Sequence, residues 1–258
     1  MHFGDLLAIE QLGADRFVVR PPGTGFLFGG LSLAVILRGA AATVEAGKTP
    51  MSLHATFLAG GVWEGPHALS IQRTNDSRAF AGRRVEMAAG DRVVVVADVV
   101  FHEPDAGEDW QATRAPDVPG PDGLEPYKDK MPVPVLEVRP VSPGSQNTME
   151  RLHPLWCRTV EPVEDPVLQA CALAFASDYR VFSTPFPAGS GRGDGLLSRT
   201  YSHLLSFHRP LAAADWWLFD CDPLSIFGGR YLSQGVAHGA DGRLLASFVQ
   251  HGYIRPAR

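Results

Sequence analysis

The chain has 258 residues, of which 45% are hydrophobic and 20% charged, and its formal net charge at pH 7 is −5. This composition can bury the core of one large domain, or of two domains of about 100 to 130 residues each. The acidic balance argues against a nucleic acid partner, and no apolar run reaches the ~20 residues that a membrane span needs.

The first half predicts one buried helix followed by strands. A loop at Pro21–Gly25 precedes Phe28-Gly29-Gly30, and the next residues, Leu31–Val44, are apolar on nearly every face. A helix that is hydrophobic all round is a buried one, so other elements must surround it. The turn Ala89-Gly90-Asp91 indicates a hairpin. The expected strands are Leu53–Leu58, Ala68–Thr74, Phe80–Met87 and Arg92–His102.

Between Pro104 and Pro143 the composition changes sharply, because nine of the chain's 21 prolines fall there. Proline punctuates regular structure and stiffens the segments that contain it. We therefore expect an extended linker that packs across the surface. The expected organisation is an N-terminal unit over 1–103, a linker over 104–150 and a C-terminal unit over 151–258.

The second half repeats this plan. Glu164-Asp165-Pro166 marks the start of a helix from Val167 to about Arg180, with acidic residues at the positive end of the helix dipole. A loop rich in Gly and Ser follows over Pro185–Gly195. The expected strands are Thr200–Arg209, Trp216–Cys221, Arg230–His238 and Leu244–Tyr253.

The two halves share a local pattern about 150 residues apart. Phe80-Ala81-Gly82-Arg83 corresponds to Phe227-Gly228-Gly229-Arg230, and each half closes on a strand that ends in proline. A period this long indicates a duplicated domain rather than a solenoid. The expected fold is α+β: an antiparallel sheet wrapped around a central helix, made twice. The two sheets would pair by their edges into one sheet with both helices on the same side, and the site would form between the halves.

The three cysteines, Cys157, Cys171 and Cys221, are odd in number and lack the spacing of metal ligands. They are typical of reduced thiols, and the N-terminus shows no basic region followed by an apolar core. We expect a cytoplasmic protein without a metal or a cofactor.

Five short stretches in order resemble the type II acyl-CoA thioesterases, which are double hotdog proteins. The stretches are Phe28-Gly29-Gly30, Phe80 with Arg83-Arg84-Val85, Ala176-Ser177-Asp178, Phe207-His208-Arg209-Pro210, and Val249-Gln250 with Gly252. The resemblance covers nearly the whole chain. It implies a hydrolase of lipid metabolism that converts an acyl-CoA substrate to a free acid and CoA. It also implies an attacking water positioned by an Asp, a Thr or Ser, and a Gln, with an oxyanion stabilised by a backbone amide at a helix N-terminus.

Carried over by position, the Gln of this family falls on Gln250. The Asp falls on Ser202, five residues before Phe207, and the Thr or Ser falls on Leu224 by direct counting or on Ser225 with a shift of one residue. We therefore expect Gln250 to orient the water with help from Ser202 or Ser225. A serine can hold a water by hydrogen bonding, although it cannot act as a carboxylate base at neutral pH.

Other polar residues offer alternatives. Asp178, at the end of the second helix, is either a second candidate carboxylate or a structural hydrogen-bonding residue, and Asp194 is either a group reaching in from its loop or a solvated turn residue. His203 is either a base or a structural histidine.

Gly29 and Gly30 could present bare amides to a carbonyl or a phosphate, or allow close packing of the helix. Arg230, like Arg83 and Arg84 in the corresponding strand, could contact the phosphates of CoA or form part of a solvated or salt-bridged face.

Two alternatives to a thioesterase remain at this stage. The serine at position 202 motivates a degenerate acyl-CoA binding or scaffold protein, and a hotdog hydratase would need a paired His and carboxylate that the sequence does not clearly supply. Hotdog units usually bury their remaining sheet edges against another copy, so we expect a homodimer or homotetramer.

Overall fold

The computed structural model describes residues 2–20, 28–60, 65–128, 135–142, 151–186, 195–211 and 215–256. It is built mainly of strands, with two long helices, and the elements that the sequence predicted occur in the expected order. The helices are α1 (Phe3–Leu6), α2 (Gly29–Ala41) and α3 (Pro166–Ser177), with short 3-10 turns η1 (Pro121–Gly123) and η2 (Val181–Ser183). The strands are β1 (Ile9–Gly13), β2 (Arg16–Val19), β3 (Thr49–Phe57), β4 (His67–Asp76), β5 (Phe80–Ala89), β6 (Arg92–His102), β7 (Leu136–Pro140), β8 (Leu155–Thr159), β9 (Leu196–Phe207), β10 (Trp217–Phe227), β11 (Arg230–Gly239) and β12 (Leu244–Pro256).

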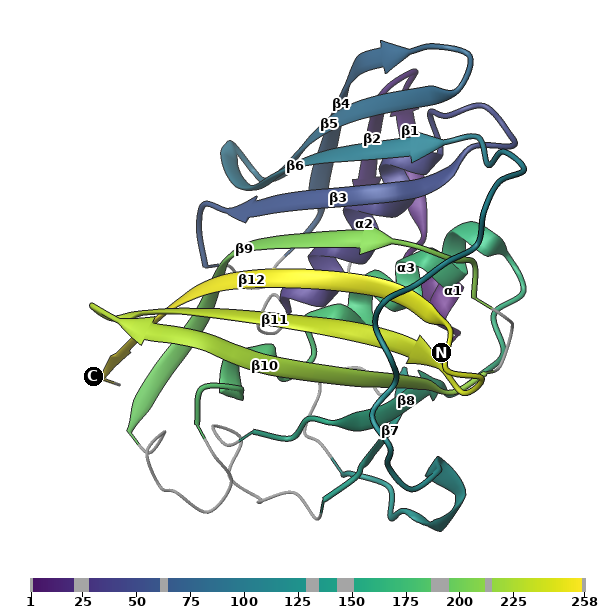
Figure 1. Cartoon of the computed structure of the whole chain (residues 1–258). Coiled ribbons are helices and arrows are strands. Elements are labelled where there is room, and N and C mark those ends of the chain that lie inside the picture. The colour runs from purple at the N-terminus through teal and green to yellow at the C-terminus, as the bar shows by residue number, and fades with distance from the viewer. Residues whose placement is uncertain are drawn as a thin grey trace.

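All twelve strands form one antiparallel sheet, in the order β1-β2-β4-β5-β6-β3-β9-β12-β11-β10-β8-β7 (Figure 1). The first six come from the N-terminal part of the chain and the last six from the rest. The two groups meet at β3 and β9, which pair antiparallel from Ser52 opposite Ser206 to Thr56 opposite Ser202. The predicted pairing of two sheets by their edges into one is therefore confirmed, and it removes two unpaired edges.

Helices α2 and α3 pack against each other on the same face of this sheet (Figure 1). Every residue of α2 from Gly30 to Leu37 is buried, as the all-round apolar pattern predicts. The helix starts at Gly29 and ends at Ala41, earlier at both ends than expected. Thr43, beyond its end, accepts a hydrogen bond from the Arg83 side chain. At the start of α3, the Asp165 side chain accepts a hydrogen bond from the Leu168 amide at 2.8 Å, which caps the helix.

The linker crosses the outer surface of the second half before it adds a strand pair. The Gln111 side chain donates to the Gly242 carbonyl and accepts from the Leu244 amide, while Asp109 pairs with Arg209 and Arg243. Figure 1 shows this segment passing in front of β12, β11 and β10. Strand β7 then pairs with β8 at the edge of the sheet. The sequence did not predict these two strands: the prolines around β7 indicated a linker, and β8 lies between that linker and the expected helix, where no strand was expected.

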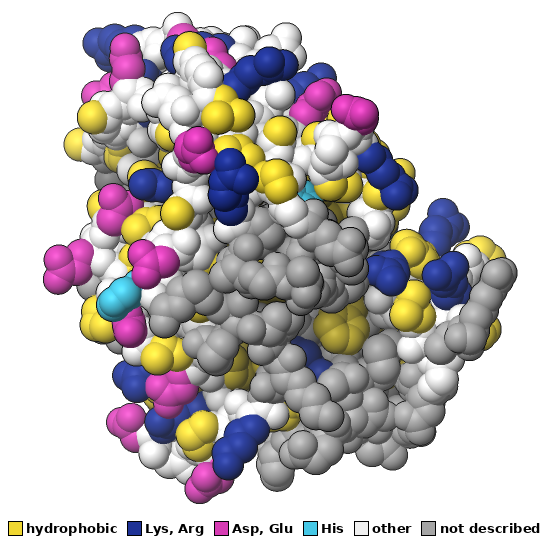
Figure 2. All heavy atoms as spheres, turned by 180° about the vertical axis from the view of Figure 1, so that it is seen from behind, with side chains coloured by type: hydrophobic (Ala, Val, Ile, Leu, Met, Phe, Trp, Pro, Cys, Tyr) yellow, Lys and Arg dark blue, Asp and Glu magenta, His cyan; other side chains and the backbone are white. Residues whose placement is uncertain are grey.

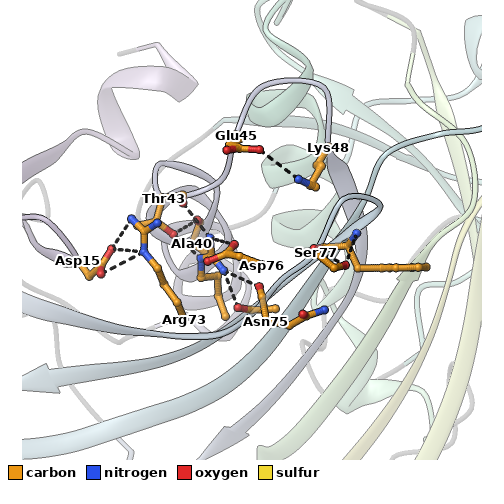
Figure 3. Close-up of polar contacts among 12 residues, drawn as sticks. Asp15, Ala40, Thr43, Glu45, Lys48, Arg73, Asn75, Asp76 and Ser77 are labelled. Atoms are coloured by element: carbon orange, nitrogen blue, oxygen red, sulfur yellow. Dashed lines mark hydrogen bonds and ion pairs between the residues drawn. The ribbon is translucent and has the colours of Figure 1, made fainter.

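Arg83 is an internal structural residue and makes no contact available to a ligand. Its side chain is 1% exposed. The guanidinium donates to the Thr43 hydroxyl and carbonyl, to the carbonyls of Asn75 and Gly82, and to the Asp76 carboxylate. Figure 3 labels three of these acceptor residues, Thr43, Asn75 and Asp76. The possibility that Arg83 binds a CoA phosphate is therefore wrong, because every direction of the guanidinium is occupied by the protein.

The neighbouring residue Arg84, unlike the buried Arg83, has a solvent-exposed side chain. It pairs with Asp98 across β5 and β6 at 2.9 Å. Exposed ion pairs of this kind contribute little to stability, because the charges stay solvated and screened.

We predict that Arg83→Leu lowers the free energy of unfolding by about 3 kcal/mol, because several buried oxygen atoms lose their donor. Arg84→Leu is the matched control and should leave the unfolding midpoint nearly unchanged. Urea denaturation followed by circular dichroism measures both. Equal midpoints for the two variants would contradict the structural role of Arg83.

Candidate active site

A buried carboxyl group, Asp178, lies where the C-terminal end of α3 meets the N-terminal end of α2. Asp178 is 5% exposed. It accepts a hydrogen bond from the Thr200 hydroxyl at 3.1 Å and another from the backbone N–H of Gly30. A carboxylate is unfavourable at the negative end of its own helix, but here it faces the positive end of a second helix. The second half thus supplies the acid, and the first half supplies the helix end that faces it.

The two glycines at the start of α2 make this approach possible. A Cβ atom on Gly29 would lie 2.5 Å from Oδ2 of Asp178, and one on Gly30 would lie 2.2 Å from the Phe175 carbonyl oxygen. Both distances are far below van der Waals contact. Of the two expectations for these glycines, the structure shows the close packing of the helix. Gly30 is buried, and its N–H donates to the Asp178 carboxylate rather than facing the cavity.

Gln250 joins the same group of polar side chains from β12. It is fully buried. Its Nε2 donates to the Thr200 hydroxyl at 3.1 Å and to the Tyr231 hydroxyl at 2.9 Å, while its Oε1 lies 2.8 Å from Nδ1 of His203. Asp178, Thr200 and Gln250 are thus connected by two consecutive hydrogen bonds, although they lie on three different elements.

An irregularity in the sheet places Thr200 in this group. His203 lies opposite Gln250 and Ser202 opposite His251, but Thr200 lies opposite Gly252, so Tyr201 is an extra residue in β9. In a regular strand, side chains three positions apart point to opposite faces. The bulge changes this phase and turns Thr200 to the inner face with His203.

Burial sets the protonation of the group. Desolvation raises the pKa of Asp178 to about 7, against the lowering effect of the hydrogen bonds from Thr200 and Gly30. Desolvation also lowers the pKa of His203 to about 4, so this imidazole is neutral at pH 7. Asp178 therefore exchanges its proton near neutral pH, which suits a carboxyl group that must first accept a proton and then return it.

A cavity of about 340 Å³ opens onto Asp178 and Thr200. Its described lining comes from both halves and includes five aromatic residues among thirteen: Phe28, Gly29, Phe57, Leu58, Ala59, Gly60, Asp178, Phe182, Ser198, Arg199, Thr200, Tyr201 and Tyr253. Such a wall suits an apolar chain, and the polar corner suits the group that reacts. The expectation that the site forms between the halves agrees with this lining.

The arrangement can hold and activate a water rather than form a thiolate nucleophile. All three cysteines are buried and unpaired, and burial raises the pKa of each thiol. In the described part of the chain, no cluster of three His, Cys, Asp or Glu side chains could hold a metal ion. A carboxylate and a hydroxyl that line a cavity can bind a water, and the carboxylate can accept its proton.

The site exists once among the described residues, although the fold is duplicated. The amides of Leu58 and His208 donate to the carbonyls of Val94 and Leu245, which fixes the correspondence between the halves. In the second half, His203 (five residues before His208) pairs with Gln250 (five residues after Leu245). The corresponding residues of the first half are Leu53 and Val99, which also pair with each other. The polar pair of one half is therefore an apolar pair in the other.

The other residues proposed from sequence lie away from this centre. Ser202 is on the face of β9 opposite to His203, and its hydroxyl is 3.4 Å from Nδ1 of His251. Ser225 lies in an exposed part of β10 beside Leu224, which is 51% exposed. The structure therefore does not bring Ser202 or Ser225 to Gln250.

Arg230 is exposed at the start of β11, opposite Tyr253 of the cavity wall. Asp194 lies outside the described residues.

The sequence left Asp178 open between a second candidate carboxylate and a structural hydrogen-bonding residue, and it did not indicate Thr200. The sequence did contain a signal for Asp178. An acidic residue at the C-terminal end of an apolar helix interacts unfavourably with the helix dipole, which indicates that another interaction or a function holds it there. No signal for Thr200 was available: regular alternation along β9 would place it on the face opposite to His203, and the bulge cannot be seen in the sequence of one strand.

Comparisons with known proteins agree with this geometry. The family profile described as the acyl-CoA thioesterase N-terminal domain matches residues 19–102, and that of the acyl-CoA thioesterase C-terminal domain matches residues 104–254. An acyl-CoA thioesterase 2 from Haemophilus influenzae is 27% identical, over 97% of this chain and 96% of the relative. Human acyl-coenzyme A thioesterase 8 is 24% identical, over 89% of this chain and 80% of the relative.

Solved structures lead to the same class. An acyl-CoA thioesterase II from Mycobacterium marinum superposes with a TM-score of 0.83 and 26% identity, covering 99% of this chain and 98% of the other. A protein with a hotdog fold from Alicyclobacillus acidocaldarius superposes with a TM-score of 0.78 and 20% identity, covering 99% and 98%. The antiparallel sheet with few helices is thus a hotdog fold. The chain belongs to the acyl-CoA thioesterase family, which confirms the resemblance seen in the sequence, and the activity of that family is hydrolysis of acyl-CoA thioesters.

We predict that Thr200→Val raises the pKa of Asp178 above 7. The variant removes a hydrogen bond to the charged form, and such a bond lowers the pKa of a carboxyl group. The ¹³C shift of the Asp178 carboxyl carbon, followed against pH and assigned with Asp178→Asn, measures this value. Thr200→Ser is the matched control and should titrate like the wild type. An unchanged pKa in Thr200→Val would exclude this hydrogen bond.

Proposed function

We propose that the chain hydrolyses acyl-CoA thioesters with a water held by Asp178 and Thr200 and oriented through Gln250, which holds Thr200 in place. The observation that carries this proposal is the run of hydrogen bonds that joins these three side chains, of which Asp178 and Thr200 line the cavity. A thioester is already an activated acyl group, so orientation and electrostatic stabilisation can supply much of the catalysis without a covalent nucleophile.

In the proposed reaction the ionised Asp178 takes a proton from the water as the water oxygen attacks the thioester carbonyl. The carbonyl oxygen gains negative charge and lies towards the positive end of α2, which favours that charge. The tetrahedral intermediate then breaks its C–S bond, and the sulfur of CoA takes the proton back from Asp178. The products are a free acid and CoA, and the carboxylate is regenerated.

The alternative of a degenerate binding protein rested on the serine at position 202. Asp178 removes that motivation, because a carboxyl group with a pKa of about 7 already stands beside Thr200 and the cavity. No observation favours the binding protein over the enzyme.

Several further features belong to the same proposal. We assign two hotdog units to residues 1–103 and 151–258, each with its sheet around a central helix, joined by a linker over 104–150. Arg230, exposed at the start of β11 and opposite Tyr253 of the cavity wall, is a candidate contact for the CoA phosphates.

A homodimer or homotetramer is supported by the exposed apolar end of β10 at Leu224, Ile226 and Phe227. A location in the cytoplasm is supported by the three cysteines, which form no disulfide. No helix among the described residues is long and apolar enough to cross a membrane. On the face in Figure 2, acidic and basic side chains are interspersed over the described residues.

We predict that Asp178→Asn lowers kcat by about 100- to 10,000-fold, the range that a general base contributes, and that Gln250→Ala also loses most turnover. Release of free thiol from acyl-CoAs of short to long chain length measures both. Ser202→Ala and Ser225→Ala are the matched controls and should stay within about twofold of wild type, since neither side chain reaches the cavity corner. A wild-type rate in Asp178→Asn would remove the carboxylate from the mechanism.

A further inference from the structure

His203 holds the far side of the Gln250 amide, away from the cavity. The ring is fully buried and stacks on Phe248, with centroids 5.6 Å apart and an interplanar angle of 16°. Nδ1 lies 2.8 Å from Oε1 of Gln250, and Nε2 lies 2.9 Å from the Ser177 hydroxyl. His203 does not line the cavity, so it touches neither substrate nor water.

The neutral ring carries one proton, and its position decides the direction of every hydrogen bond as far as Asp178. With the proton on Nδ1, the ring donates to Oε1 of Gln250. The Gln250 Nε2 group then donates to Thr200, and Thr200 must send its only proton to Asp178. Ser177 donates its proton to the bare Nε2. Each group in this pattern has a partner, and the pattern ends on an ionised carboxylate, which can only accept.

With the proton on Nε2 the pattern reverses. The ring donates to the Ser177 hydroxyl, which donates in turn to the Ala174 carbonyl at 2.9 Å. Gln250 must turn its amide by 180° to donate to Nδ1, and its oxygen then takes the protons of Thr200 and Tyr231. Asp178 loses the donor that stabilises its ionised form, so this pattern suits only the protonated acid.

We propose that His203 is a positioning residue whose Nδ1–H donates to Oε1 of Gln250 and so holds the Gln250 amide in one orientation, in which Thr200 always donates to Asp178. The fixed orientation of the Gln250 amide keeps the Thr200 hydrogen bond on Asp178, which stabilises the ionised carboxylate that accepts a proton from water. This role rests on the proposed function, because it orients the groups that would hold the water.

Few other groups can change the charge of Asp178. Among the described residues, three titratable or charged groups lie near Asp178 or His203. Tyr231 on β11 has a pKa that burial raises, and Arg199 lies on the cavity wall. His54 lies on β3, and its charge lowers the pKa of His203. The backbone of α2 adds the Gly30 N–H.

The first half shows which substitution the fold can accept. Leu53 occupies in β3 the position that His203 occupies in β9, and it is likewise fully buried. His203→Leu therefore removes the Nδ1–H donor with a side chain that this sheet already packs. His203→Asn keeps an N–H donor near the place of Nδ1–H. His238→Leu is the matched control, because His238 is also a fully buried sheet histidine and its ring nitrogens make no hydrogen bond among the described residues.

We expect His203→Leu to lower kcat about 100-fold, the loss that misplacement by about 1 Å can cause, with KM within about twofold. The acid limb of its kcat/KM profile should move to higher pH, since Thr200 is then free to turn away from Asp178. His203→Asn should recover at least tenfold of the lost kcat, and His238→Leu should behave as wild type. Circular dichroism melting of each variant shows whether it is folded.

The wild-type protein provides a test that does not depend on activity. ¹⁵N NMR of the His203 ring, assigned with His203→Asn, distinguishes Nδ1–H from Nε2–H, and we expect Nδ1–H. An Nε2–H ring, a folded His203→Leu variant with wild-type kcat, or a His203→Asn variant no faster than His203→Leu would each overturn this role of His203. An Nδ1–H ring in a protein that hydrolyses no acyl-CoA would instead overturn the proposed function and leave the orientation intact.

Discussion

The burial of one carboxyl group between two helix ends is the constraint on which the rest of the site depends. Asp178 can stay there only because Gly29 and Gly30 leave no side chain in its way and because Thr200 and the Gly30 N–H satisfy its oxygens. The cost of desolvation is what raises its pKa to about 7. A more exposed acid would be ionised far below neutral pH and would be a weaker base, so the close contact of α2 and α3 is part of the proposed chemistry as well as of the core.

This constraint also explains why a duplicated fold carries one site among its described residues. The first half contributes a helix end and the aromatic wall around Phe57, while the second half contributes the acid, the hydroxyl and the amide. At the position of the His203–Gln250 pair, the first half has Leu53 and Val99, which fill the core without polar groups. A buried polar network is favourable only when every member has a partner, and the first half avoids that requirement with an apolar pair.

Much of the fold could be predicted from the sequence, because local chemistry decides it. The Gly90 turn predicted the hairpin of β5 and β6, the apolar run predicted α2, and the repeated pattern predicted the duplication. The pattern aligned Arg83 with Arg230, but Arg83 lies opposite Val99 and Ser233 lies opposite Gln250, so the strand pairing aligns Arg83 with Ser233 instead. The site could be predicted only in part: Gln250 and the two glycines lie at its centre, whereas Ser202 points to the other face. Thr200 could not be found, because its direction depends on a bulge that only the pairing of β9 with β12 creates.

The central claim is that Asp178, held near neutral pKa by burial, acts as the base that activates water. The pH dependence of kcat/KM of the wild-type protein tests it most directly, because this profile reports the free enzyme. Below pH 7 the acid is protonated and cannot accept a proton from water, so kcat/KM should rise about tenfold per pH unit and level off above about pH 7. His203 stays neutral over this range and adds no second step. A profile that is flat between pH 5 and 8, or that falls as pH rises through 7, would contradict the account.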